Sequence, residues 1–232
     1  MRPLSLLAPL LFALAGCATS GGALGGAPTA DAEARDLVVL IHGMGRSPFS
    51  MVPLDLALRR DGHRTLNVGY DSFGPSIEEI AVGVAAEIDR AVESEAPRRI
   101  HFVGHSLGNI IARQLIATDR PERLGRVVML APPNQGSATA DRLTRWVGWM
   151  LRPIGELRTA ESTVAAMPPP RDVEVAIIAG DRDTKVSVDE SRLAGAAEHV
   201  VVASGHTWIM TKPSVMRRVR CFVETGATEC GG

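Results

Sequence analysis

The sequence predicts an α/β fold, built on a mostly parallel sheet with helices on both of its faces. Short runs of β-branched and aliphatic residues recur along the chain, and segments with helical spacing of apolar residues lie between them. No two successive runs are joined by a hairpin turn, so each connection is expected to cross over the sheet. A chain of 232 residues is long enough for one such domain with a full core.

Six segments are expected to form the strands. The first, Leu37-Val-Val-Leu-Ile41, is apolar throughout, as is typical of a parallel strand that is buried on both faces. The other five predicted strands cover residues 64–70, 99–103, 126–130, 173–179 and 199–203.

Three helices can be assigned between or after these strands. Ser76-Ile-Glu-Glu79 has the capping-box pattern that begins a helix, and apolar residues continue it at helical spacing toward Glu93. The other two predicted helices cover residues 107–117 and about 211–223.

The N-terminal residues have the pattern of a targeting segment. One positive charge precedes the apolar stretch Leu4–Leu14, which is typical of a signal peptide over residues 1–16 and is too short to span a bilayer. Leu14-Ala-Gly-Cys17 resembles a bacterial lipobox, and this resemblance implies that Cys17 becomes the lipidated first residue of a lipoprotein. The alternative is an ordinary cleaved signal peptide with an incidental cysteine.

The resemblance to lipoproteins also suggests a location. Residue 18 is Ala rather than Asp, which by analogy with lipoprotein sorting indicates the outer membrane of a bacterial envelope, facing the periplasm or the surface. Residues 17–35 are rich in Gly and Ala and are expected to form a flexible tether. The folded domain is therefore predicted to cover residues 36–232.

The chain has three cysteines. If Cys17 is acylated, Cys221 and Cys230 remain as a pair near the C-terminus. They are expected to form a disulfide in an oxidising periplasm, and two free thiols are the alternative.

The composition excludes some classes of partner. The formal net charge is −1, so no nucleic-acid partner is expected. No cluster of metal ligands is visible in the sequence, and no metal or other cofactor is predicted. The protein is expected to be a monomer.

The motif that indicates chemistry is Gly104-His-Ser-Leu-Gly108, placed between a predicted strand and a predicted helix. A G-x-S-x-G sequence in this context predicts a nucleophile elbow, a sharp turn that exposes the hydroxyl of Ser106 above the sheet edge. Glycines flank the serine because a Cβ at either position would clash with the closely approaching backbone. A chance match is the alternative, but it would rarely have both flanking elements.

A serine nucleophile needs a base, and the base needs an orienting acid. His206 follows the last predicted strand in a glycine-containing loop and is the candidate base. Asp183 lies a few residues past the preceding strand and is the candidate acid. Asp181 and Asp189 lie in the same loop and are interpreted as turn or cap residues.

An oxyanion hole should complete such a site. One backbone N–H is expected from Leu107, directly after the nucleophile, and the other from the loop that follows the first strand. That loop reads His42-Gly-Met-Gly45, which resembles the His-Gly loop of lipases and esterases and makes Met44 the expected donor. An ordinary glycine turn is the alternative.

Together these motifs resemble the α/β-hydrolase superfamily over residues 36–224, and small bacterial lipases and esterases within it. Ala131-Pro-Pro-Asn-Gln-Gly-Ser137 is also similar to a segment that follows the sixth strand in many lipases. The resemblance implies a minimal six-stranded sheet of order 4-3-5-6-7-8 in family labels, without the family's first two strands. One departure is Asn109, where many relatives have glycine; it removes no catalytic atom.

The resemblance also gives the insertion 138–170 a role as a small cap above the active site. Apolar residues with helical spacing form a stripe in it. They are Leu143, Trp146, Val147, Met150, Leu151 and Ile154. A mobile cap that touches lipid and a permanently packed helix both remain open. Such a cap would favour hydrophobic ester or lipid substrates.

The predicted function is hydrolysis of carboxylic esters through a triad of Ser106, His206 and Asp183 and an acyl-enzyme. Two alternatives stay open from the sequence. The same triad could transfer the acyl group to an acceptor other than water, or the chain could be a non-catalytic lipoprotein scaffold that keeps the fold.

Overall fold

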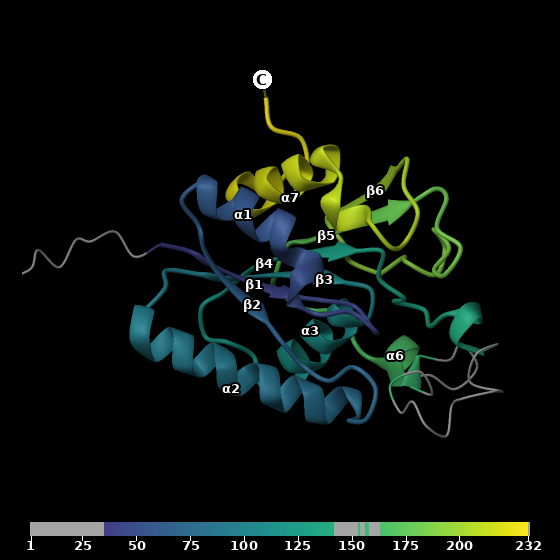
Figure 1. Ribbon diagram of the computed structural model, residues 1–232, viewed down its shortest axis with the longest axis horizontal. Coiled ribbons are helices and arrows are strands. Elements are labelled where there is room, and N and C mark those ends of the chain that lie inside the picture. The colour runs from purple at the N-terminus through teal and green to yellow at the C-terminus, as the bar shows by residue number, and fades with distance from the viewer. Residues whose placement is uncertain (1–34, 142–152, 154–155, 158–162, 232) are drawn as a thin grey trace, which may run out of the picture. The chain divides into compact units, whose positions relative to one another are not determined.

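A six-stranded, wholly parallel sheet forms the centre of the domain, with strand order β2-β1-β3-β4-β5-β6 (Figure 1). The computed structural model describes residues 35–141, 153, 156–157 and 163–231. The strands are β1 (Leu37–Ile41), β2 (Arg64–Val68), β3 (Ile100–His105), β4 (Leu124–Leu130), β5 (Val175–Gly180) and β6 (Glu198–Val202). In family labels this is the predicted order 4-3-5-6-7-8, so the fold prediction is confirmed.

Some predicted features lie outside the described residues. They include the signal segment, Cys17 and the tether up to residue 34. The apolar stripe of the insertion, from Leu143 to Ile154, lies outside them as well.

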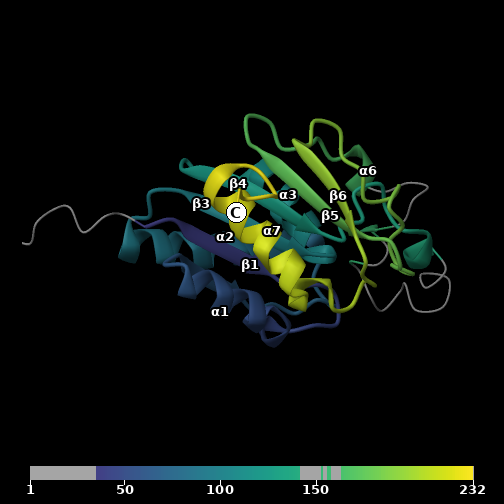
Figure 2. The ribbon, with the colours of Figure 1, turned by 90° about the horizontal axis from the view of Figure 1, so that it is seen from above.

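Helices cover both faces of the sheet (Figures 1 and 2). One face is covered by α1 (Val52–Arg60) and α7 (Pro213–Thr225), and the other by α2 (Ile77–Glu95) and α3 (Leu107–Thr118). Two smaller 3-10 turns, η1 (Pro48–Met51) and η2 (Ile209–Thr211), and the short helix α6 (Thr163–Ala166) complete the described elements.

The alternation of side chains along β1 divides the core into two layers. Val38 and Leu40 belong to the apolar cluster beneath α1 and α7, whereas Val39 and Ile41 belong to the cluster beneath α2 and α3. All five residues of this strand are buried. A strand with apolar residues on both faces is stable only between two helical layers, which explains why the sequence has no polar alternation there.

The helix α2 begins as the capping box predicts. The Ser76 hydroxyl accepts the Glu79 N–H at 3.1 Å, and the Glu79 carboxylate accepts the Ser76 N–H at 2.7 Å. The helix ends at Glu95, directly before Ala96, whose φ of 42° breaks the helical path.

The helix α1 was not predicted from the sequence. Only Leu54 and Leu58 are buried in it, so its apolar pattern is a single i, i+4 pair. Its formation depends on packing beside α7 over the sheet. The predicted strands agree with the structure to within two residues at their ends, and β3 continues two residues beyond its predicted end, to His105 within the elbow motif.

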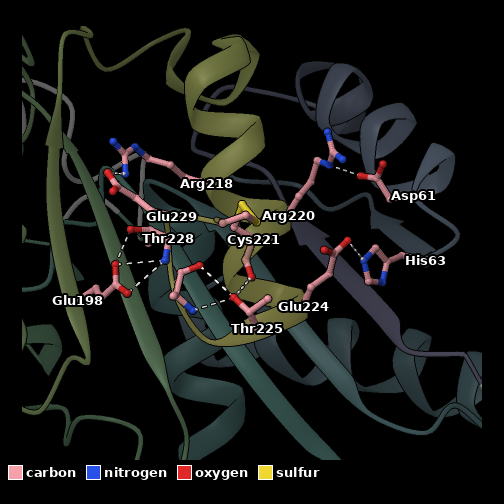
Figure 3. Close-up of a disulfide and its surroundings, with 12 residues drawn as sticks. Asp61, His63, Glu198, Arg218, Arg220, Cys221, Glu224, Thr225, Thr228 and Glu229 are labelled. Carbon is pink, nitrogen blue, oxygen red and sulfur yellow. Dashed lines mark hydrogen bonds and ion pairs between the residues drawn. A yellow bond between two sulfur atoms is a disulfide. The ribbon is translucent and has the colours of Figure 1, made fainter. Parts of the chain in front are cut away.

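The C-terminal residues are attached to the domain by a disulfide between Cys221 of α7 and Cys230 (Figure 3). The intervening loop is also held by Thr228, whose N–H donates to the Glu198 carboxylate at 3.1 Å, and by an ion pair of Arg218 with Glu229 at 3.0 Å. These contacts bind the chain end to β6 and to α7, on the far side of the domain from the carboxyl edge of the sheet.

Candidate active site

Four loops meet at the carboxyl edge of the sheet, where the strand order changes direction. β1 lies between β2 and β3, so the chain crosses to opposite sides from this point, and a crevice forms outside the strand ends. Ser106 directly follows β3, and the register pairs Ile41 with Gly104. The loop after β1 therefore lies beside the serine.

The turn at Ser106 is strained in the way a nucleophile elbow requires. Its φ of 52° and ψ of −120° are rare for a residue with a side chain, and such a conformation costs about 1–3 kcal/mol. A Cβ at Gly104 would lie 2.5 Å from the Asn109 side-chain oxygen, and one at Gly108 would overlap the carbonyl oxygen of Ile41. Only glycine fits at either position.

Three predicted residues form one chain of hydrogen bonds. The His206 Nε2 lies 2.9 Å from the Ser106 Oγ, and the His206 Nδ1 lies 2.7 Å from Asp183 Oδ2. Because a carboxylate can only accept, Nδ1 carries the proton, and the Nε2 lone pair faces the serine hydroxyl. The imidazole is therefore oriented to accept the Ser106 proton.

The Asp183 carboxylate is almost fully buried, with 1% of its side chain exposed. Burial alone would raise its pKa. The hydrogen bonds from His206 and from the N–H groups of Val186 and Lys185 outweigh burial, so the pKa of Asp183 lies below its ordinary value. The acid stays ionised and can stabilise a positively charged His206.

The other two aspartates of this loop do not contact His206. Asp181 accepts the backbone N–H of Ser204 at 3.1 Å and so ties the acid loop to the histidine loop. Asp189 is exposed and pairs with Arg192 at 3.1 Å. Both have the turn and capping roles that their positions suggest.

The two predicted oxyanion donors lie close to the nucleophile: Leu107 follows Ser106 directly, and Met44 lines the same cavity as Ser106. Met44 lies in a tight turn closed by the Arg46 N–H on the Gly43 carbonyl at 3.2 Å, with Gly45 at a φ of 64°. Within the described part of the chain, neither the Met44 N–H nor the Leu107 N–H has an acceptor. Free N–H groups beside a nucleophile can bind a developing oxyanion.

Side chains from the loop after β2 hold this turn in place. The Ser72 hydroxyl accepts the Gly45 N–H at 2.9 Å, and the Tyr70 hydroxyl donates to the His42 carbonyl. The Tyr70 ring is stacked on the His42 imidazole, 4.1 Å between centroids. Burial lowers the pKa of His42, so this ring is neutral and serves as packing.

His105 is a site neighbour to which sequence reasoning gave no role. Its Nε2 donates to the His206 backbone carbonyl at 3.0 Å, and the two rings lie 5.1 Å apart. Burial, together with the charge of His206, lowers the pKa of His105 to about 3. A neutral His105 thus supports the loop that carries the base. Only its place within the elbow motif could have indicated this.

A buried arginine fixes the loop that begins the insertion. Arg113 of α3 donates to the Asn134 carbonyl at 3.3 Å and to its side-chain oxygen at 3.1 Å, and also bonds the Met167 carbonyl. Asn134 in turn donates to the Ser191 carbonyl at 2.8 Å. The lipase-like segment that contains Asn134 is therefore a structural connection between α3 and the acid loop.

The site opens into a cavity of about 190 Å³, smaller than the roughly 300–1,000 Å³ typical of pockets for drug-sized ligands. Its lining is mainly apolar. Met44, Pro133, Ala140, Leu157 and Val186 are among the residues that line it. Ala140 and Leu157 belong to the insertion 138–170, so part of that insertion lines the cavity that contains the serine.

Two features are absent from the residues that the structure describes. No group of three or more His, Cys, Asp or Glu side chains could hold a metal ion in that part of the chain. Within the same ranges, no helix has the length and apolar character needed to cross a membrane.

The fold and the site define a hydrolase of the α/β type. The chain belongs to the alpha/beta hydrolase family, whose sequence model matches residues 38–169. A curated relative, "Putative carbamate hydrolase RutD" of Variovorax paradoxus, is 32% identical over 117 residues, which are 47% of this chain and 42% of that protein. The chain therefore spans less than half the length of this relative.

Solved structures share the fold at low sequence identity. The mature lipase BlEst2 of Bacillus licheniformis superposes with a TM-score of 0.65 at 15% identity, over 77% of this chain and 88% of that one. The Pyrococcus furiosus esterase PF2001 gives a TM-score of 0.59 at 20% identity, over 82% and 81%. Phospholipase PlaB of Legionella pneumophila gives 0.65 at 15% identity, over 79% and 56%.

Proposed function

We propose that this protein is a serine hydrolase that cleaves carboxylic esters through an acyl-enzyme. The observation that carries the proposal is the continuous hydrogen-bond chain from Ser106 through His206 to Asp183, placed beside two free backbone N–H groups. The strained backbone at Ser106 lowers the folding stability of the domain. A structural role would not require such a turn, whereas a catalytic serine does.

In the acylation step, the Ser106 Oγ attacks the ester carbonyl carbon while its proton passes to the His206 Nε2. The carbonyl π electrons move to the oxygen, where the N–H groups of Met44 and Leu107 stabilise the negative charge. When the tetrahedral intermediate collapses, the C–O bond to the alcohol breaks. The imidazolium of His206 gives its proton to the leaving alkoxide, so an alcohol and a neutral histidine result.

In the deacylation step, a water molecule takes the place of the alcohol. His206 accepts its proton as the water oxygen attacks the acyl carbon, and the Ser106 oxygen leaves with the proton that His206 returns. Asp183 holds the imidazole by its Nδ1–H throughout and balances its transient charge. An acceptor alcohol or amine in place of water would give acyl transfer with the same residues.

A carbamate is a second candidate substrate, because the relative from Variovorax paradoxus is named for carbamate hydrolysis. Its carbonyl would be attacked in the same way, with a less reactive acyl carbon. Including a carbamate beside esters in the substrate panel separates the two functions.

The test uses a fluorophosphonate probe and a panel of 4-nitrophenyl esters of graded acyl length. We expect the purified protein to label with the probe and to hydrolyse the short esters, whereas Ser106→Ala should lose both properties. Equal ester hydrolysis by wild type and Ser106→Ala would overturn the proposal. Product analysis with added alcohol separates hydrolysis from acyl transfer.

We also propose that the enzyme is a lipoprotein of the bacterial envelope. This rests on the sequence alone, on the lipobox Leu14-Ala-Gly-Cys17 and the small-residue tether that follows it. Metabolic labelling with a palmitate analogue should mark the wild-type protein and not Cys17→Ser. Retention of the label in that variant would contradict lipidation of Cys17.

A further inference from the structure

Two cationic side chains, Arg46 and Lys185, line the cavity that contains Ser106. Among the described residues, neither takes part in an ion pair, and no Asp or Glu lines the cavity. The nearest carboxylate, Asp183, is already bound to His206 and to two backbone N–H groups. The positive charge of these two lining residues is thus left without a protein counter-charge in the described part of the chain.

Arg46 is held in place before any ligand arrives. Its guanidinium lies over the indole ring of Trp208, 5.0 Å from the centroid. Trp208 follows two residues after His206, and Arg46 follows two residues after Met44, so the contact joins the histidine loop to the oxyanion loop. A guanidinium stacked on an aromatic face keeps its N–H groups free for a planar anion.

Lys185 reaches the cavity from the loop after β5. Its backbone N–H donates to Asp183 Oδ1 at 2.8 Å, and its carbonyl accepts the Ser137 hydroxyl at 2.7 Å. The loop after β5 is therefore fixed at this residue, while the ammonium group remains exposed. Arg46 follows β1 and Lys185 follows β5, so the two cations reach the cavity that contains Ser106 from different loops.

The apolar and the cationic lining residues suggest that two chemically different parts of one substrate bind in the cavity. The apolar lining of the cavity that contains the serine, from Met44, Leu157 and Val186, suits a short hydrocarbon segment. Arg46 is half-buried and Lys185 is exposed, and the two cations suit a negative group at the far end of that segment. An uncharged long-chain ester would gain nothing from them and would desolvate them on binding.

We propose that Arg46 and Lys185 form an anion subsite, and that the preferred substrates are short esters carrying a carboxylate or phosphate group. This rests on the proposed esterase function and specifies its substrate class. The anion adds binding energy that neutral esters of the same length lack, and it aligns the ester with the Met44 and Leu107 N–H groups.

The experiment compares matched esters by kcat/KM. For the acyl side, mono-4-nitrophenyl glutarate is compared with 4-nitrophenyl butyrate. For the alcohol side, 1-butyrylglycerol 3-phosphate is compared with 1-butyrylglycerol. We expect at least one anionic ester to be preferred, and this preference to weaken as salt rises from 0.01 to 0.5 M, because exposed charges are screened.

The variant Arg46→Gln with Lys185→Gln should lower the anionic-to-neutral ratio about tenfold, mainly through KM, as the charge-assisted contacts are lost. Arg46→Lys should retain part of the preference. The matched control, Arg60→Gln with Arg99→Gln, removes the same charge at the opposite, amino edge of the sheet, where α1 ends and β3 begins. It should leave the ratio unchanged.

Three results would overturn the subsite. One is hydrolysis of neutral esters, sensitive to Ser106→Ala, with no preference for either anionic ester. Another is a preference that the double variant leaves intact. The third is a fall in the anionic-to-neutral ratio of kcat/KM that is as large in the control variant as in the double variant at Arg46 and Lys185. Each of these leaves the esterase function standing, whereas absence of turnover and of probe labelling would overturn the function and the subsite together.

Discussion

The side-chain amide of Asn109 donates a hydrogen bond to the carbonyl of Ser106 at 3.1 Å. The same amide donates to the Leu130 carbonyl at 3.0 Å, which also accepts the Ser106 N–H at 2.9 Å. Asn109 thus connects the elbow to the end of β4. Through these two hydrogen bonds, Asn109 stabilises the strained backbone conformation of Ser106.

Asn109→Ala should destabilise the domain by about 1–3 kcal/mol, because the two carbonyls lose a buried donor. It should also lower kcat more than it raises KM, since a looser elbow misplaces the Ser106 hydroxyl. Urea unfolding and steady-state kinetics measure both effects. Gln114→Ala, on the same helix but without a comparable contact, is the control. Equal stability of the two variants would show that the Asn109 bonds contribute nothing.

Asp183→Asn should reduce kcat by about 10²- to 10⁴-fold, because an amide no longer fixes the His206 tautomer or stabilises its charge. Asp181→Asn is the matched control in the same loop. Its side-chain oxygen can still accept the Ser204 N–H, so activity should change little. The ester assay compares the activities of the two variants. A larger loss of activity in Asp181→Asn than in Asp183→Asn would assign the role of the acid to Asp181.

Two glycine substitutions should change stability in opposite directions. In Gly108→Ala the new Cβ overlaps the Ile41 carbonyl and lies 2.6 Å from the His42 carbonyl, so a loss of about 3 kcal/mol or more is expected. In Gly83→Ala, within α2, nothing lies within 4 Å, and a gain of about 0.5–1 kcal/mol is expected. Thermal unfolding tests the pair. A stable Gly108→Ala would contradict the close approach of the elbow to β1.

Stability should fall as the pH is lowered from about 6.5 toward 4. Burial lowers the pKa of His101 to about 4 and that of His105 to about 3. Below pH 6.5 the unfolded chain binds protons at these residues and the folded chain does not, so acid favours unfolding by about 1.4 kcal/mol per pH unit for each histidine. The pKa of Asp36, which pairs with His101, is lowered, so its contribution is lost only below its ordinary value of 3.8.

The variant His101→Gln isolates one of these histidines. The slope of the unfolding free energy between pH 6 and 4.5, measured by urea titration, should decrease by about one proton equivalent. The Arg126 N–H donates to the His101 Nδ1 at 2.9 Å, which shows that the ring is neutral, and glutamine can accept the same bond. An unchanged slope would mean that His101 is protonated in the folded state.

The sheet and its order could be predicted from the sequence because buried parallel strands have continuous apolar sequences, such as Leu37–Ile41. Their crossover connections then allow few topologies. The elbow was predictable for a similar reason, since Gly104 and Gly108 are required by local backbone contacts. The helix α1 was not predicted, because two buried leucines are too weak a periodic signal without the neighbouring α7.

The sequence by itself determined the residue types for the site and their order along the chain: a nucleophile, then an acid, then a base. The position past the strand end already favoured Asp183 over Asp181 and Asp189. Only the tertiary structure shows its hydrogen bond to His206, because that bond depends on the distance between two loops whose residues are 23 positions apart. The roles of His105, Asn109 and Arg46 also depend on such contacts. Local patterns encode strands and turns, whereas the meeting of three strand ends at one edge is a property of the folded sheet.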